Sequence, residues 1–269
     1  MLIQEKALKH WIDHFYGYGS WGARTWFIAL EEGGGDTPEE VAEKVNYFYR
    51  THSENPHSTL CDIRELYRHV SVNWEGPKAS LFKNMFDFRF SDKAVLHGVW
   101  KNLIAFEHGH RHQDASDLLE YQKNAFASTS IGNEALIRLY PLPSPHNHAW
   151  YYSWLDLPQL AFLKRRELYQ EHVFHARIQI ILDNMNTYKP ELVLMYGMEN
   201  INTLKKSVQD FFPNANFKMV KAIKRQIPQH HLAHLNGTTL IITTQIPALR
   251  HNRIETGFDW EAFGRSIGS

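Results

Sequence analysis

The order of apolar and polar stretches along the chain predicts an α/β protein. Continuous apolar runs without polar alternation predict buried strands at 26–30, 135–139, 192–197 and 238–243, with a shorter strand at 217–220. Apolar residues spaced three and four apart predict helices, most clearly at 8–15, 41–49, 160–186, 199–211 and 260–267. Buried strands that alternate with helices imply a parallel sheet covered by helices on both faces.

Residues 59–125 form the longest stretch that lacks a predicted buried strand. Helical patterns occur there at 60–70 and 93–106, and the polar segment 73–78 predicts a loop. The chain has 269 residues, of which 43% are hydrophobic, so it is long enough to bury a substantial core. We therefore expect a single domain, 1–269, with a helical insertion at about 59–125.

Charge and cysteine content narrow the functional classes only slightly. The 29 basic residues balance the 29 acidic ones, so any attraction to nucleic acid must be local. Cys61 is the single cysteine and falls in a helical pattern. One cysteine cannot form an intramolecular disulfide or hold a four-cysteine iron-sulfur cluster. No apolar run of membrane-spanning length and no secretory signal occur, so we expect a cytoplasmic protein without membrane contact.

The segment R-T-W-F-I-A-L-E-E-G-G-G-D at 24–36 is the most informative of the chain. Its predicted strand ends at two carboxylates, Glu31 and Glu32, which are followed by Gly33, Gly34 and Gly35. Carboxylates beside accessible backbone N–H groups, at the carboxyl end of a strand, are typical of the reactive edge of an α/β sheet. The alternative is a turn that leads into an acidic helix start, because Thr-Pro-Glu-Glu follows at 37–40.

Three other strand ends carry polar residues that parallel strands would bring to the same edge. Arg138 precedes Y-P-L at 140–142, the strand 192–197 leads into M-E-N, and the last strand leads into Q-I-P-A-L-R-H-N-R at 245–253. Acid, glycine, proline and basic residues would therefore meet in one place.

This set of strand ends resembles the uracil-DNA glycosylase superfamily. L-E-E-G-G stands where that family has G-Q-D-P-Y or G-E-A-P-G, which puts Glu32 at the catalytic Asp, with Glu31 beside it. R-L-Y-P-L replaces N-x-C-P-L, which puts Arg138 at the base-reading Asn. T-Q-I-P-A-L-R replaces H-P-S-P, which puts Gln245 at the usual His and Leu249 or Arg250 at the wedge inserted into DNA. The resemblance implies a three-layer α/β sandwich with a central, mostly parallel, four-stranded sheet.

The function that the resemblance implies is that of a DNA glycosylase. Such an enzyme flips a base out of the stack, hydrolyses its N-glycosidic bond and leaves an abasic site for base excision, without a metal or cofactor. Glu32, or Glu31, would orient the water. Tyr140 would contact the base. The loops after the strands would bind the DNA through Gly33, Gly34, Gly35, Leu249, Arg250, His251 and Arg253. DNA is the expected partner, and a monomer is expected.

Two departures from the family bear on the substrate. The side chain of Arg138 only donates hydrogen bonds, whereas Asn both donates and accepts, and Gln245 offers a departing base only a neutral hydrogen bond. A modified base, larger than uracil, would accommodate both changes. Some bacterial members of this kind resemble phage-defence glycosylases that remove glucosylated hydroxymethylcytosine, and a hypermodified cytosine of phage DNA is therefore one expected substrate.

Other interpretations stay open from the sequence. The fold could serve a catalytically inactive nucleic-acid-binding protein or a hydrolase of free nucleosides or nucleotides, and residues 250–253 could form a solvent-facing loop. E-H-G-H-R-H at 107–112 offers imidazoles for zinc, but a loop of solvated histidines between two helices is favoured. Nicotinamide and nucleoside-triphosphate loops, G-x-G-x-x-G and G-x-x-x-x-G-K-S/T, are absent.

Overall fold

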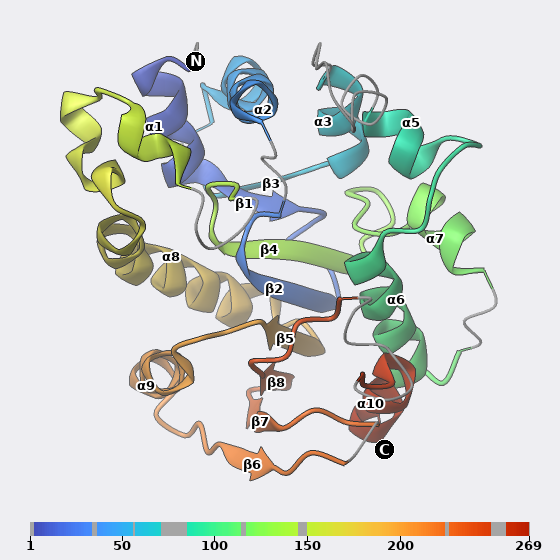
Figure 1. Ribbon diagram of the computed structural model, residues 1–269. Helices are drawn as coiled ribbons and strands as arrows, with labels where there is room; N and C mark the ends of the chain where they lie inside the picture. Colours follow the sequence, from blue (N-terminus) through green and yellow to red (C-terminus); the bar gives the residue numbers. More distant parts are fainter. Residues whose placement is uncertain are drawn as a thin grey trace.

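The computed structural model describes residues 3–33, 37–55, 57–70, 85–113, 117–144, 150–223, 226–248 and 257–268. One sheet of eight strands, in the order β3-β1-β4-β2-β5-β8-β7-β6, runs through this part of the chain, from β3 at the top of Figure 1 to β6 at the bottom. The strands are β1 (Phe15–Tyr18), β2 (Thr25–Glu31), β3 (Thr59–Cys61), β4 (Glu134–Tyr140), β5 (Leu192–Tyr196), β6 (Lys218–Val220), β7 (His230–Leu235) and β8 (Thr238–Ile242).

The directions of the strands make the sheet mixed. β2 pairs in parallel with both β4 and β5, and β5 pairs in parallel with β8. β1 is parallel to β3 but antiparallel to β4, and β7 is antiparallel to both β6 and β8. The predicted α/β class is confirmed, whereas the expectation of a parallel sheet is wrong for its outer strands, and the sheet is wider than four strands.

The strands that the pattern did not predict are short or polar. In β7 the sequence H-H-L-A-H-L places histidines at half of its positions, so no apolar run marks it. β1 follows α1 directly, and Phe15, expected in the helix, begins the strand. Gly17 lets β1 approach β4, because its φ is +133° and a Cβ there would lie 1.9 Å from the carbonyl oxygen of Leu136. A side chain at that position would separate the two strands.

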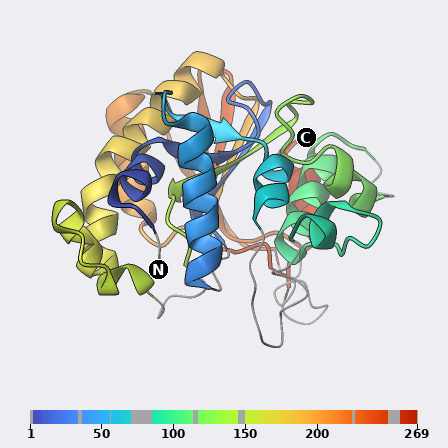
Figure 2. The same cartoon turned by 90° about the horizontal axis from the view of Figure 1, so that it is seen from above.

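Helices cover both faces of the sheet. α1 (Glu5–His14), α8 (Arg166–Tyr188) and α9 (Ile201–Phe211) lie to the left of the sheet in Figure 1, and α6 (Gly98–His110) and α10 (Trp260–Ile267) lie to the right. α2 (Pro38–His52) and α3 (Ile63–His69) lie over the β3 end, which faces the viewer in Figure 2. The remaining helices are α5 (Met85–Phe90), α7 (Leu118–Asn124) and the 3-10 helices η1 (Tyr151–Trp154) and η2 (Pro158–Lys164).

The helix start that was the alternative interpretation of the glycine segment is present. The hydroxyl of Thr37 accepts a hydrogen bond from the backbone N–H of Glu40 at 3.1 Å, and Pro38 is the first residue of α2. A capped helix and a strand end rich in carboxylates therefore occur together, and the first does not exclude the second.

The predicted helical insertion begins with a strand. Residues 60 and 61, expected at the start of a helix, belong to β3, which ends at Cys61, and α3, α5, α6 and α7 follow it. The predicted loop at 73–78 lies outside the described residues. α6 crosses α10 at very close range, because a Cβ on Gly264 would lie 1.9 Å from the carbonyl oxygen of Phe106. This crossing attaches the insertion to the carboxyl-terminal helix.

None of the helices in the described ranges combines the length and the apolar character needed to cross a lipid bilayer.

Candidate active site

A cavity of about 450 Å³ lies where β2, β4 and β5 end. Its walls come from Glu31, Glu32 and Gly33 after β2, from Arg138 of β4, and from Tyr196 and Gly197 at the end of β5. Ile246, which follows β8, also lines it, and α3, α5 and the start of α6 contribute further lining residues. The cavity therefore occupies the sheet edge at which ligands bind in α/β proteins.

Glu32 is a buried carboxylate at the inner wall of this cavity. Its side chain is 2% exposed, and its two oxygens have separate partners. The hydroxyl of Tyr18 donates to Oε1 at 2.8 Å, and Nε of Arg138 donates to Oε2 at 2.5 Å. A buried charge needs such compensation, since an unpaired carboxylate would be costly in a low-dielectric interior. The three side chains thus fix the position and charge balance of the inner wall.

Arg138 lines the cavity, as its predicted role in reading a base requires, but it is also bound within the wall. Besides its bond to Glu32, Nη1 donates to the carbonyl oxygen of Ile137 at 3.3 Å, and its guanidinium lies 6.0 Å from the ring centre of Tyr18. The backbone at Arg138 is fixed too, because Nη2 of Arg177 on α8 donates to its carbonyl oxygen at 2.7 Å. The side chain therefore has little freedom to reorient toward a ligand.

Glu31, the neighbouring carboxylate, faces the other helix layer. Arg166, at the start of α8, donates to it from two nitrogens, one of them Nε at 2.8 Å from Oε1. Nε2 of Gln170 donates to the same oxygen at 2.9 Å. This bidentate pair lies at the cavity wall and is less buried than the Glu32 pair, at 14% and 11% exposure. Glu32 is therefore the deeper of the two candidates.

A second buried ion pair stands behind the cavity on α2. Nζ of Lys44 donates to Oε1 of Glu40 at 2.6 Å, and both side chains are almost fully enclosed. Burial is the largest influence and would lower the pKa of Lys44, but the charges of Glu40, Tyr67 and Glu32 and the hydrogen bond to Glu40 together raise that pKa above its ordinary value. Glu40 lines the cavity, and Lys44 lies 5.4 Å from the ring centre of Tyr67. The two pairs together leave the inner wall close to neutral.

Another part of the cavity wall comes from the helical insertion. It presents Tyr67 of α3, Arg89 of α5, and His97 and Trp100 at the start of α6. Nδ1 of His97 accepts the backbone N–H of Trp100 at 3.3 Å, and the two rings stack with centres 4.5 Å apart. Burial, and next the charges of Arg89 and Arg138, lower the pKa of His97 to about 3. His97 is therefore a neutral imidazole at neutral pH.

These insertion residues were not among the sequence candidates. Nothing in their spacing separates them from the amphipathic pattern of ordinary helices, since Trp100 also belongs to the core. Only the placement of α5 and α6 against the strand ends brings them to the cavity. The expected aromatic contact, Tyr140, instead lines a hollow of about 350 Å³ beside α8 and α9, where burial and next Glu31 raise its pKa to about 12.

Gln245, the other expected base contact, does not line the cavity. Its Nε2 lies 3.5 Å from the carbonyl oxygen of Ile246, whose side chain reaches the cavity in its place. Gly33 is exposed at the cavity mouth, and a Cβ there would meet nothing within 4 Å. The remaining predicted DNA contacts, Gly34, Gly35, Leu249, Arg250, His251 and Arg253, lie outside the described residues.

The histidine-rich segment 107–112 is not a loop. Its first four residues belong to α6, and Nε of Arg111 pairs with Glu107 one turn earlier. Among the residues that the structure places, no group of three His, Cys, Asp or Glu side chains is arranged to hold a metal ion. Burial, and next Glu32, raise the pKa of the Cys61 thiol well above its usual value, which disfavours a nucleophilic thiolate.

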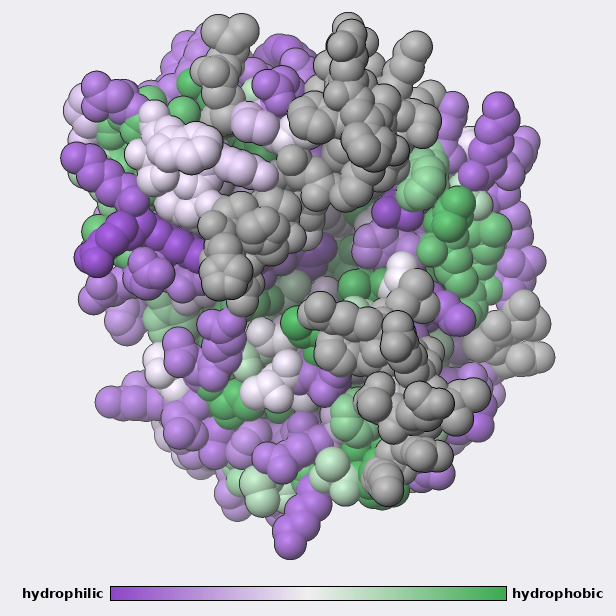
Figure 3. All heavy atoms as spheres, in the orientation of Figure 1, coloured by the Kyte–Doolittle hydropathy of each residue, from purple (hydrophilic) through white to green (hydrophobic). Residues whose placement is uncertain are grey.

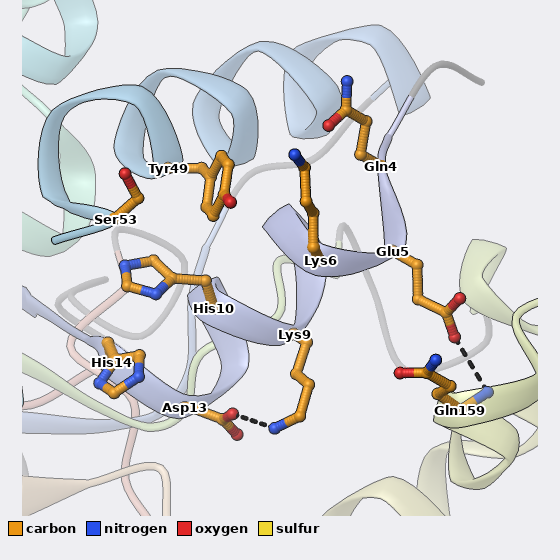
Figure 4. A pocket seen from close by; sticks show the side chains of 10 residues that line it. All are labelled: Gln4, Glu5, Lys6, Lys9, His10, Asp13, His14, Tyr49, Ser53 and Gln159. Atoms are coloured by element: carbon orange, nitrogen blue, oxygen red, sulfur yellow. Dashed lines mark hydrogen bonds and ion pairs between the residues drawn. The ribbon is translucent and has the colours of Figure 1, made fainter. Parts of the chain in front are cut away.

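A wider hollow, of about 590 Å³, lies on the outside of α1 and α2 (Figure 4). Its charged side chains are engaged locally: Lys9 pairs with Asp13, and Glu5 accepts the backbone N–H of Gln159 at 2.9 Å. No strand end contributes to it. Its size therefore does not outweigh the chemistry gathered in the smaller cavity.

The outer surface does not single out a partner. On the face shown in Figure 3, hydrophilic residues predominate around the periphery, and hydrophobic residues show between them. Attraction to a charged polymer must therefore arise near the cavity, as the equal numbers of acidic and basic residues already implied.

Comparison with known proteins finds no match: no family model, no curated protein and no solved structure is similar to the chain. The function must be argued from the site itself.

Proposed function

We propose that the protein is a DNA glycosylase that accepts a flipped, modified base in the cavity at the strand ends and hydrolyses its N-glycosidic bond. The observation that carries the proposal is the Glu32 carboxylate, 2% exposed and fixed by Arg138 and Tyr18 on the inner wall of that cavity. A fixed carboxylate on the wall of a cavity is what a hydrolase needs to orient a water molecule.

The arrangement of the strands supports the proposal. β4, β2, β5 and β8 are neighbours in the sheet and mutually parallel, so the segments that follow them meet at one edge. These are the strands whose ends carry the motifs that resemble the uracil-DNA glycosylase superfamily. We infer that they correspond to the central, four-stranded parallel sheet of that fold, with the outer strands added to it.

The size and lining of the cavity also suit a base. Its volume of about 450 Å³ falls within the range of ~300–1,000 Å³ common for small-molecule sites. Aromatic side chains of Tyr18, Tyr67 and Trp100 line it, and such rings hold a flipped base by stacking. The space exceeds what a single unmodified ring occupies, which favours a base with a substituent.

The chemistry follows from the hydrogen bonds of Glu32. Each carboxylate oxygen has two acceptor positions, and the bonds to Tyr18 and Arg138 use one on each oxygen. The remaining positions can accept the hydrogens of a water molecule. That water adds its oxygen to C1′ of the sugar and transfers a proton to Glu32, while the base departs with the electron pair of the broken C1′–N bond and then takes up a proton.

Base release from defined DNAs tests this function. Oligonucleotides with a single uracil, hydroxymethylcytosine or glucosylated hydroxymethylcytosine are incubated with the protein, and abasic sites are cleaved with alkali. The proposal expects strand cleavage at one of these bases and its loss in Glu32→Gln. Tight DNA binding without any abasic product would instead indicate an inactive nucleic-acid-binding protein, and base release only from monomers would indicate a nucleoside or nucleotide hydrolase.

A further inference from the structure

The charged side chains that line the cavity form ion pairs, with two exceptions among the described residues, Glu199 and Arg89. Glu31 pairs with Arg166, Glu32 with Arg138, and Glu40 with Lys44. Another acid at the cavity, Glu199, is exposed at its rim. Arg89 has no such pair, since no carboxylate among the described residues lies within ion-pair distance of its guanidinium.

Arg89 nevertheless stands in a partly buried position. It belongs to α5, its side chain lines the cavity, and its guanidinium lies 4.5 Å from the ring centre of Phe88. Burial lowers the pKa of Arg89, which shows that the surroundings penalise its positive charge. Arginine nonetheless remains protonated in proteins, so the wall carries a cation for which the described residues supply no ion-pair partner.

His97 adds a second donor beside Arg89. Its Nδ1 accepts the N–H of Trp100, so in the neutral ring the hydrogen resides on Nε2. The amide of Gln122 bridges the two residues, since it donates to the carbonyl oxygen of Arg89 at 2.9 Å and accepts the backbone N–H of His97 at 2.8 Å, and both residues line the cavity. Neither group offers an acceptor in this state. The two side chains can therefore only donate hydrogen bonds to a ligand, and together they carry one positive charge.

We propose that Arg89 and His97 form a subsite for an oxyanion carried by the ligand, either a carboxylate or a phosphate. The guanidinium fork matches the two oxygens of either group, and the imidazole N–H supplies a further donor. The inference rests on the proposed function insofar as the ligand is a nucleotide. Two sources of the oxyanion are then possible: a carboxylate on the base, or the phosphate attached to the sugar.

Binding of matched pairs of small molecules tests the subsite without requiring catalysis. Calorimetric titration compares uracil with 5-carboxyuracil, and deoxyuridine with its 5′-monophosphate, on the full chain. In the wild type, the anion of at least one pair is expected to bind at least ~10-fold more tightly than its neutral parent, as one charge-assisted bidentate contact would give. The pair that shows the preference identifies the source.

Variants assign the preference to the subsite. Arg89→Gln is expected to reduce the preference to less than twofold, and His97→Phe to weaken it severalfold. Arg68→Gln is the matched control, because Arg68 is an exposed arginine near α5 that does not line the cavity, and it is expected to retain the full preference. If Arg89→Gln fails to fold, as thermal melting would show, Arg89→Lys serves instead and should reduce the preference severalfold.

The subsite is overturned if neither anion binds more tightly than its parent, or if the preference survives in Arg89→Gln. These outcomes are separate from those of the base-release assay. If the anion preference depends on Arg89 but no base is released from any of the DNAs, the glycosylase proposal is contradicted and the subsite is not. If base release depends on Glu32 but neither anion binds more tightly than its neutral parent, the subsite is contradicted and the glycosylase proposal is not.

Discussion

Nε of Arg138 donates to Oε2 of Glu32 across neighbouring parallel strands, 106 positions apart in the sequence, with both side chains buried. The pair joins the two strand ends that the sequence had singled out separately, one as acid and one as base reader. Its consequence is that neither residue acts alone: the arginine compensates the carboxylate, and the carboxylate holds the arginine in the wall.

The contributions of Glu32 and Arg138 to the free energy of unfolding should be strongly coupled. Arg138→Met leaves Glu32 buried without its cation, and Glu32→Gln leaves the guanidinium without its anion, so each single change should cost about 3–5 kcal/mol. The double variant should cost less than the sum, since it removes both charges. Urea unfolding of the four proteins measures the coupling, and additive losses would show that the pair is not a unit.

Arg177 should be among the most sensitive positions for stability. Its side chain is 2% exposed and donates only to backbone carbonyls: those of Leu139, Ile12, Phe15 and Arg138. Lysine cannot reproduce this fork, so Arg177→Lys should lower the free energy of unfolding by about 3 kcal/mol or more. Arg165→Lys, at an exposed position before α8, is the matched control and should change it little. Equal effects in urea unfolding would contradict the tethering role.

Glu134 predicts a pH dependence of stability. Burial, more than any other cause, raises its pKa from 4.5 to about 7. Between these values the folded protein retains a proton that the unfolded chain has released, so stability is fully present below pH ~4.5 and is lost as the pH rises through ~7. The loss should be on the order of 3 kcal/mol.

Chemical unfolding between pH 5 and 8 measures this slope. Glu134→Gln should remove that part of it, whereas Glu54→Gln, at an exposed position, should leave it in place. An identical slope in the wild type and in Glu134→Gln would show that another group is responsible.

Two glycines at the cavity should respond differently to alanine. Gly197 has a φ of +67°, and a Cβ there would lie 3.2 Å from Cγ1 of Ile246, so Gly197→Ala should cost about 1–2 kcal/mol. Gly33 has open space at its Cβ position, so Gly33→Ala should stay within about 0.5 kcal/mol of the wild type. Thermal melting of both variants tests this, and a reversed order would contradict the geometry.

The sequence predicted the buried strands because their apolar runs are continuous, and it predicted Glu32 because a carboxylate directly follows such a run. It missed β7, whose histidines interrupt the apolar pattern, and β1, whose Phe15 continues the spacing of the preceding helix. Arg89 and His97 could not be predicted, since only tertiary packing of the insertion brings them to the cavity that Glu32 lines. Local sequence patterns predict where a strand ends, but they do not predict which helix packs against that end.

The partners of Glu31 also could not be predicted from the sequence. Two adjacent carboxylates were equivalent candidates from the sequence, and their separate partners distinguish them: Arg166 and Gln170 for Glu31, Arg138 and Tyr18 for Glu32. We therefore expect Glu31→Gln to reduce base release less than tenfold and Glu32→Gln to reduce it by about 10²–10⁴-fold, the range for a lost general base. Single-turnover rates for both variants, with circular dichroism as a check of folding, measure the difference. Equal losses would contradict the assignment of Glu32 as the catalytic carboxylate.

The most direct test of the central claim is mass spectrometry of the free base released from DNA that carries glucosylated hydroxymethylcytosine, hydroxymethylcytosine or uracil. The wild type should release one of these bases and leave an abasic site, and folded Glu32→Gln should release it at least ~100-fold more slowly. Release of no base by the wild type, or equal release by Glu32→Gln, would contradict the central claim.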